Sequence, residues 1–175
     1  MNKKQAGTRA SKIQKKKRAL RKQLWGDLDP NKIWNRKEND GYTTIPRTMP
    51  IIFQIADNLA EKSKPISGVY FSLWCRVFDE SFIEIKSQEE MAFESGFSGQ
   101  RAVSTWKNRM KNLASLGFID AKEGASGEYS YVLLLNPYMV LKKYHEEGRI
   151  QEAKYNALFA RAQEVGAVDL IQPVG

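Results

Sequence analysis

One stretch near the middle of the chain carries the boundary signals of two consecutive helices, and these signals constrain the fold most. Ser87 and Glu90 have the spacing of a capping box, in which each side chain satisfies an exposed backbone N–H of the other residue. Gly96 ends this first helix, because glycine accepts the left-handed conformation of a helix C-terminus, and Ser98 offers a new N-cap. We therefore predict a short helix, a tight turn and a second helix over Gly99–Leu116.

The second helix is expected to bury one face and to lead into a β-hairpin. Gly117 stops this helix, and two alternating or apolar runs follow, Phe118–Lys122 and Tyr129–Asn136, separated by a loop with two glycines. Phe82–Ile85 is short and alternating, and is expected to form a brief strand before the first helix. The residues predicted to lie on the buried stripe of the second helix are Val103, Trp106, Met110, Leu113 and Leu116.

Four further helices are expected, two before this segment and two after it. Apolar residues at helical spacing predict one helix from Thr48 to about Lys62–Pro65 and another over Ser67–Glu80, although the aromatic and branched residues of the latter would also suit a strand. After a proline the helical pattern returns over Tyr138–Glu147 and Arg149–Val165. The fold class is therefore mainly α with a small β-hairpin.

Positive charge is concentrated at the N-terminus. The chain has a net charge of +8, and residues 1–26 hold ten Lys or Arg and no acid, which leaves 18 basic and 20 acidic residues in the rest. A polybasic segment with few aromatic residues buries too little surface to offset its chain entropy, so residues 1–24 are expected to be a disordered basic arm that binds polyanions. Residues 10–24 are mostly good helix formers and can coil on contact with a partner. A solubilising tail and a membrane-surface segment are the alternatives, and the second lacks the bulky apolar face of interfacial helices.

These features predict four parts: the arm at residues 1–24, a linker at 25–47 rich in turn-forming residues, a folded domain at 48–136, and a C-terminal helical extension and tail at 137–175. The apolar positions of residues 138–158 either cover the core of the folded domain or pair with a second copy of the chain. Of the two, we expect the homodimer.

The composition argues against several classes of site. With one cysteine, Cys75, and one histidine, His145, the chain forms neither an internal disulfide nor a Cys/His zinc site. Cys75 lies among apolar residues and is expected to be buried, and His145 to lie at the surface. The acidic pairs suit helix capping better than acid–base catalysis, and no glycine-rich phosphate loop is present, so we expect no enzyme, no cofactor and no metal. No apolar run approaches the roughly 20 residues that span a bilayer, and the start lacks the apolar part of a secretory signal, so we expect a cytoplasmic protein without membrane contact.

The middle of the chain resembles a known family of nucleic-acid-binding domains. Met91-Ala92, then Gly96-Phe97-Ser98, then Val103 looks like the signature of the winged helix-turn-helix family, in which a small residue lets two helices cross closely and glycine opens the turn. The resemblance covers residues 48–136 and implies a double-stranded DNA-binding domain. It also implies that the second helix enters the major groove while the hairpin, or wing, contacts the backbone or the minor groove.

A more general resemblance extends from Leu73-Trp74-Cys75 through Gly117-Phe118-Ile119. This region is similar to DNA-binding proteins of bacterial plasmids and other mobile elements, including winged-helix replication initiators. The resemblance implies a transcriptional regulator, or an accessory factor of replication, partition or conjugation.

The second helix supplies the candidate readout residues independently of the resemblance. No acid occurs over Ser95–Ile119, which carries four basic residues, whereas ordinary exposed helices usually mix both signs. Gln100 and Arg101 are expected in the first turn of the helix, the part that lies nearest the bases. The candidate DNA-binding residues are Gln100, Arg101, Ser104, Thr105, Lys107, Asn108 and Lys111, together with Lys15, Lys16, Lys17, Arg18 and Arg21 of the arm.

Three alternatives to duplex DNA binding remain open. The polar side of the second helix is also compatible with an ordinary solvated face. A winged-helix core can instead dock a protein partner while the arm binds nucleic acid without specificity. A third alternative is an RNA-binding protein.

Overall fold

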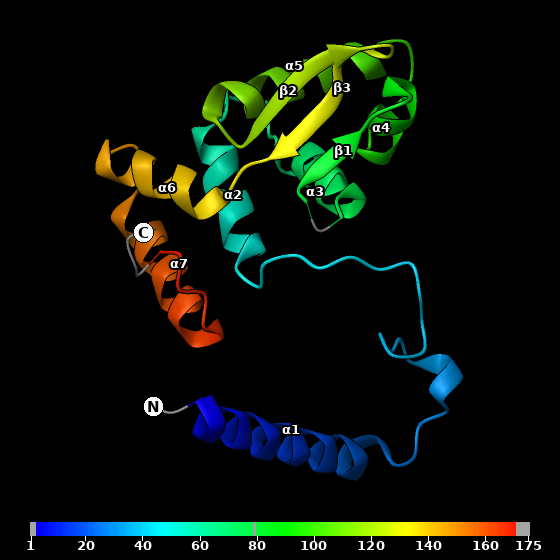
Figure 1. Ribbon diagram of the computed structural model, residues 1–175, viewed down its shortest axis with the longest axis vertical. Helices are drawn as coiled ribbons and strands as arrows, with labels where there is room; N and C mark the ends of the chain where they lie inside the picture. The colour runs from blue at the N-terminus through cyan, green and yellow to red at the C-terminus, as the bar shows by residue number, and fades with distance from the viewer. Residues whose placement is uncertain (1–2, 79, 171–175) are drawn as a thin grey trace. The chain divides into compact units, whose positions relative to one another are not determined.

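The computed structural model describes residues 3–78 and 80–170, within which the chain is mixed α/β, with seven α-helices and one three-stranded antiparallel sheet (Figure 1). The chain divides into two units, Met1–Tyr42 and Thr43–Gly175, which are called unit 1 and unit 2 below. Each unit is described by itself.

Unit 1 begins with helix α1 (Lys3–Trp25), in the segment that the sequence predicts to be a basic arm able to coil on contact with a partner. The segment is long, rich in Lys, Arg, Ala and Gln and free of proline, so its helical propensity is high. The side chains of residues 11–25 are all exposed, including those of Ile13, Leu20 and Leu24. Over residues 11–25 the helix is therefore supported by its local sequence and not by burial.

The rest of unit 1 is a series of locally hydrogen-bonded turns. A three-residue 3-10 helix, η1 (Pro30–Lys32), follows Asp29, whose carboxylate accepts a hydrogen bond from the backbone N–H of Asn31. A second turn is centred on Asn35–Asn39. The turn-forming composition of this region is thus reflected in defined turns.

Unit 2 starts with two helices that are joined by a shared carboxylate. One oxygen of Asp57, near the end of α2, accepts hydrogen bonds from the backbone N–H groups of Ile66 and Ser67 at the start of α3, and the other accepts from the Ser67 hydroxyl. The elements of unit 2 are α2 (Met49–Leu59), α3 (Ser67–Arg76), β1 (Phe82–Glu84), α4 (Gln88–Glu94), α5 (Ala102–Leu116), β2 (Ile119–Gly124), β3 (Gly127–Leu134), α6 (Pro137–Glu146) and α7 (Glu152–Val165). The predicted helices and strands are therefore present, and the helix over 67–80 stops at Arg76.

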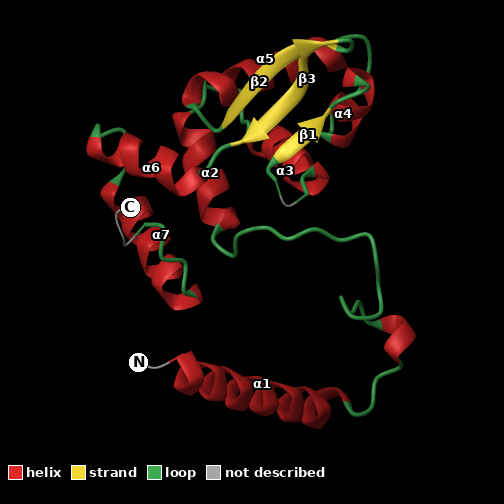
Figure 2. Ribbon diagram, viewed as in Figure 1, coloured by secondary structure: helices red, strands yellow, loops and turns green. Residues whose placement is uncertain are grey.

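The sheet has the strand order β1-β3-β2, so the hairpin strand β3 is central. Val132 on β3 lies opposite Ile83 on β1 and Ala121 on β2. Ile83, Val132 and Leu134 are buried, whereas the alternate residues Phe82, Tyr131 and Leu133 are exposed. Helix α5 lies behind the sheet in Figure 2, and the opposite face of the sheet points toward the viewer.

The core of unit 2 lies between this sheet and the helices. Its largest fully buried side chains include Trp106, Tyr70 and Phe118, which come from α5, α3 and the residue before β2. The rings of Tyr70 and Phe118 lie 5.3 Å apart between centroids. Burial raises the pKa of Tyr70 to about 12, which fits a phenol removed from water.

The C-terminal helices complete this core. Tyr138, Leu141 and Tyr144 of α6 and Leu158 of α7 are buried, and α7 packs against α2. The buried positions of residues 138–158 therefore cover the core, which is the first of the two predicted alternatives. These buried positions are not free to form a homodimer contact, and the homodimer itself stays a prediction.

Cys75 corrects another expectation, because the thiol is exposed and not buried. Helix α3 turns its Val69, Tyr70 and Leu73 face inward, and Cys75 falls on the opposite side. Apolar neighbours in sequence did not reveal this, since residues two apart on a helix point in different directions.

Candidate nucleic-acid interface

Helices α4 and α5 pack against each other and are joined by a short turn. Ser87 caps α4 as predicted, with its hydroxyl accepting a hydrogen bond from the Glu90 N–H at 3.1 Å. The Glu90 carboxylate binds Arg76 of α3 at 2.7 Å. The structure therefore contains the serine half of the capping box, while Glu90 ties α4 to α3.

Two glycines form the turn between these helices. Gly96 and Gly99 have φ values of +88° and +78°, in the left-handed region that side chains rarely adopt. Because Gly99 has this conformation, it is outside the right-handed helix, and α5 begins at Ala102 with Arg101 at the N-cap position. The predictions of Ser98 as N-cap and of a helix starting at Gly99 were wrong.

This boundary changes where two candidate residues lie. Gln100 and Arg101 belong to the turn that precedes α5 and not to its first helical turn, and both are exposed. They remain next to the N-terminus of α5, where the free backbone N–H groups and the helix dipole favour a negative charge.

Helix α5 separates apolar and polar residues between two faces. Trp106, Met110 and Leu113 are buried as predicted, while Val103 is partly buried. Ser104 and Lys111 are exposed on the other face, and the remaining members of that face, Thr105, Lys107 and Asn108, are partly buried. Together with Gln100 and Arg101, these residues are called the α5 face below.

Two members of the α5 face have partners of their own. Lys107 lies 3.7 Å from the Glu128 carboxylate at the start of the hairpin strand β3. The Asn108 side-chain oxygen accepts a hydrogen bond from Arg109 at 3.1 Å, and the Arg109 guanidinium lies 6.0 Å from the Phe97 ring centre. Arg109 was not among the candidate residues, yet it is the residue that orients the Asn108 amide.

The hairpin itself carries excess negative charge. The described loop and strands of the hairpin hold Asp120, Glu123 and Glu128 against a single basic residue, Lys122. An acidic hairpin is poorly suited to phosphate contacts, since like charges repel at short range. This departs from what the family resemblance implies for a wing.

The basic candidates of unit 1 lie on α1. Lys15, Lys16, Lys17, Arg18 and Arg21 are all exposed there. They occupy several sides of the helix, because consecutive residues are about 100° apart around an α-helix. They thus provide a general positive field around α1 and no single reading face.

Other chemistry is sparse. His145 is partly buried, its ring stacks on Tyr155 at 3.6 Å between centroids, and its Nε2 lies 2.9 Å from the Glu152 carboxylate. This histidine therefore joins α6 to α7. Within residues 3–78 and 80–170, no group of three or more metal-ligating side chains is close enough to hold an ion. No helix in the same residues has the length and apolar character to cross a bilayer.

Comparisons with known proteins add no assignment. No family model, no curated protein and no solved structure matches the chain.

Proposed function

We propose that this chain binds double-stranded DNA through a winged helix-turn-helix in which α4 is the first helix, α5 is the recognition helix and β2–β3 is the wing. The order of elements in unit 2, the two-glycine turn and the packing of α5 under the sheet support this fold assignment. The recognition helix of such domains enters the major groove with its N-terminal residues nearest the bases.

The observation that carries the proposal is the α5 face. It combines two amide side chains, two hydroxyls and three cations without an acid, and that set can meet base edges and phosphates. A solvated helix face ordinarily mixes charges of both signs. Trp106, Met110 and Leu113 on the opposite face of α5 are buried in the core, whereas Gln100, Arg101, Ser104 and Lys111 are exposed to solvent.

The proposed biological role rests on the general resemblance to DNA-binding proteins of bacterial plasmids and other mobile elements. A DNA-binding domain of this size with a basic N-terminal helix fits a regulator of transcription, or a replication, partition or conjugation accessory factor of a bacterial mobile element. Selection of bound sequences from a random duplex pool would identify the site that is read.

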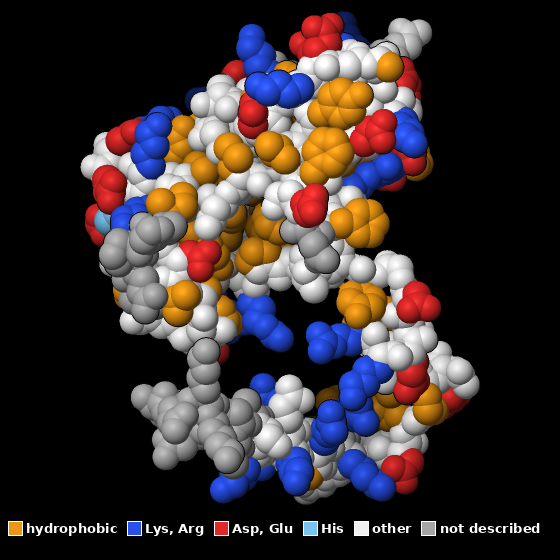
Figure 3. All heavy atoms as spheres, viewed as in Figure 1, with side chains coloured by type: hydrophobic (Ala, Val, Ile, Leu, Met, Phe, Trp, Pro, Cys, Tyr) orange, Lys and Arg blue, Asp and Glu red, His pale blue; other side chains and the backbone are white. Residues whose placement is uncertain are grey.

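A second candidate function is a protein-interaction module. The observation that favours it is the uncovered face of the sheet, where Phe82 is 48% exposed, Leu133 is 42% exposed, and the Phe82 and Tyr131 rings stack at 6.2 Å between centroids. Figure 3 shows hydrophobic side chains gathered over this part of unit 2. Large exposed apolar patches of this kind mark sites of contact with other proteins.

The test compares two charge-removing variants of the full chain. Arg101→Ala removes a cation from the α5 face, and Lys143→Ala removes one from an exposed site on α6. Affinity is measured by fluorescence anisotropy on the selected duplex, a scrambled duplex and a structured RNA. We expect Arg101→Ala to weaken binding to the selected duplex by about 1–3 kcal/mol if it contacts a base, and Lys143→Ala to change it little.

The same measurement separates the alternatives. Equal losses on both duplexes for Arg101→Ala would assign a phosphate contact and not base readout. If alanine at Gln100, Arg101, Ser104 and Asn108 leaves affinity for both duplexes intact, α5 is not the reading helix. The interaction module is then the better account. Tighter binding to the RNA than to either duplex would instead favour the RNA-binding alternative.

A further inference from the structure

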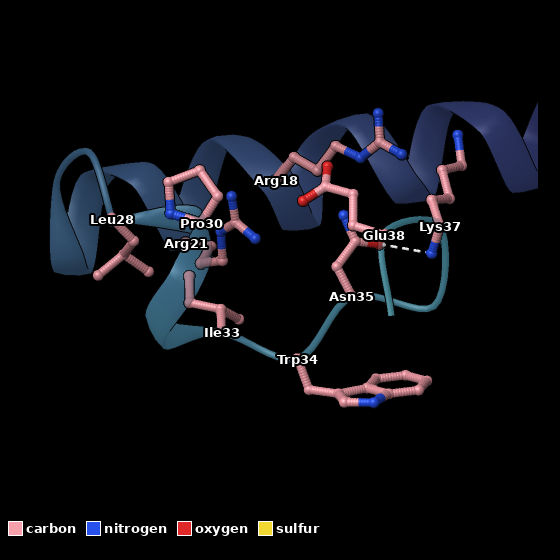
Figure 4. Close-up of a pocket in the computed structure, with 9 residues that line it drawn as sticks. All are labelled: Arg18, Arg21, Leu28, Pro30, Ile33, Trp34, Asn35, Lys37 and Glu38. Carbon is pink, nitrogen blue, oxygen red and sulfur yellow. Dashed lines mark hydrogen bonds between the residues drawn. The ribbon is translucent and has the colours of Figure 1, made fainter. Parts of the chain in front are cut away.

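Unit 1 contains a groove of its own between helix α1 and the turns that follow it (Figure 4). The groove has a volume of about 520 Å³ and is lined by residues of α1 and of residues 28–38. It lies entirely inside unit 1. The proposed reading helix α5 contributes nothing to it.

Local hydrogen bonds hold the turn side of this groove. The backbone N–H of Lys37 donates to the Asn35 side-chain oxygen at 3.1 Å, the bond drawn as a dashed line in Figure 4. The backbone N–H of Asn35 donates in turn to the side-chain oxygen of Asn39 at 2.7 Å. Asp29 caps η1 at the other end of the turn segment. The groove wall is thus ordered before any ligand binds, which lowers the entropic cost of binding.

The groove is suited to a polyanion. Arg18, Arg21 and Lys37 line it together with one acid, Glu38. The surrounding residues 1–42 hold 13 basic and four acidic residues, so the field of the whole unit is positive as well. Arginine forks match phosphate oxygens in geometry and charge.

An exposed tryptophan stands beside the same groove. Trp34 lines it in part, but the indole points away from α1 in Figure 4, and 63% of the residue is exposed. The ring of Tyr42 lies nearly perpendicular to the indole, with centroids 5.8 Å apart and an angle of 87° between the planes. The two rings are therefore not stacked in parallel.

We propose that unit 1 binds single-stranded nucleic acid, with backbone phosphates at Arg18, Arg21 and Lys37 and an unpaired base stacked on Trp34. Cations that follow a backbone, combined with an aromatic ring for a base, are the usual means of binding single strands. A base within a duplex is already stacked on its neighbours, so it is not available to a single surface indole. This site is independent of the duplex proposal for α5.

The test uses the full-length chain with two matched tryptophan variants. Trp34→Ala removes the stacking ring, while Trp25→Ala removes a ring that is 65% exposed but does not line the groove. The probes are a labelled oligothymidine, a labelled duplex of the same length, and vesicles of neutral and anionic phospholipid. Both variants are checked by circular dichroism, and both are expected to keep the parent spectrum because these rings are exposed.

We expect Trp34→Ala to weaken oligothymidine binding by about 5- to 100-fold, as is typical for the loss of one stacked base, and Trp25→Ala to change it by less than about twofold. Neither variant should alter affinity for the duplex. Equal losses for the two variants would overturn the stacking site, and unchanged oligothymidine binding in Trp34→Ala would overturn it and leave charge as the source of binding. Binding to anionic vesicles that exceeds binding to the oligonucleotide, and that depends on Trp34, would assign the site to a membrane surface instead. Loss of duplex binding in Arg101→Ala with retained oligothymidine binding would show that the two sites act separately.

Discussion

Replacement of Trp106 tests whether α5 is anchored as the structure describes. Trp106 is 0% exposed, and its ring lies edge-on to Tyr129 of β3, with centroids 5.7 Å apart. Its indole N–H has no hydrogen-bond partner within the described part of the chain. The side chain therefore contributes a large buried apolar surface and, at the same time, an unpaired polar group.

These two contributions give different expectations for two variants. Trp106→Ala removes the whole ring and leaves a cavity, so the free energy of unfolding should fall by about 3–5 kcal/mol. Trp106→Phe keeps an aromatic ring near Tyr129 and removes the unpaired N–H, whose burial costs about 1–3 kcal/mol. That gain offsets the lost ring area, and the Phe variant should remain within about 1 kcal/mol of the parent.

The assay is urea unfolding followed by far-UV circular dichroism, which does not depend on tryptophan fluorescence. With a slope of about 2 kcal/mol per molar urea, the Ala variant should unfold at a urea concentration lower by about 2 M. Trp34→Ala serves as the control, and an exposed site of this kind should shift stability by no more than about 0.5 kcal/mol. A loss below about 1 kcal/mol in Trp106→Ala, or an equal loss in both Trp106 variants, would refute the burial argument.

Three further predictions concern charge and the exposed thiol. Glu128→Gln should raise affinity for the duplex by up to about fivefold, because it removes the acid that faces Lys107. The control Glu146→Gln on α6 should leave this affinity unchanged, and unchanged affinity in both variants would place the hairpin away from the duplex. Deletion of residues 2–24 should weaken binding to any duplex. The steepness of the plot of log affinity against log salt should fall by about 0.9 for each lost phosphate contact, and an unchanged steepness would make α1 a solubility element. The exposed Cys75 is still partly shielded from water by neighbouring protein atoms, and this shielding, together with the charge of Glu94, raises the pKa of its thiol. The pH midpoint of its alkylation should therefore be higher in the folded chain than in urea, and a lower midpoint would contradict this.

Local sequence signals predicted the centre of unit 2 well. The Ser87 cap, the glycine that ends α4 and the stripe of Trp106, Met110 and Leu113 all depend on neighbours within a few residues. The hairpin was predicted for the same reason, since alternation and a glycine turn are local features. Its strand ends differ from the prediction by one to two residues.

Features that depend on backbone detail or tertiary packing were not predictable in this way. The start of α5 moved to Ala102 because Gly99 adopts a left-handed conformation, and the sequence alone does not specify which of two glycines and a serine will do so. The exposure of Cys75 depends on which side of α3 meets the core. The pairing of Lys107 with Glu128 joins residues far apart in sequence, so no spacing rule indicates it.

The charge distribution of unit 2 bears on how it would approach a duplex. The turn and α5 form an acid-free positive surface, while the hairpin beside it is acidic and the Lys107–Glu128 contact lies between them. A duplex approaching the α5 face gains from Arg101 and Lys111 at once, but it gains from Lys107 only if the phosphate competes successfully with Glu128. The hairpin would therefore lower nonspecific phosphate affinity of unit 2, and base contacts at Gln100 and Arg101 would account for a larger share of its binding. General affinity for polyanions would then come mainly from α1, where the basic residues between positions 11 and 25 are exposed on several sides.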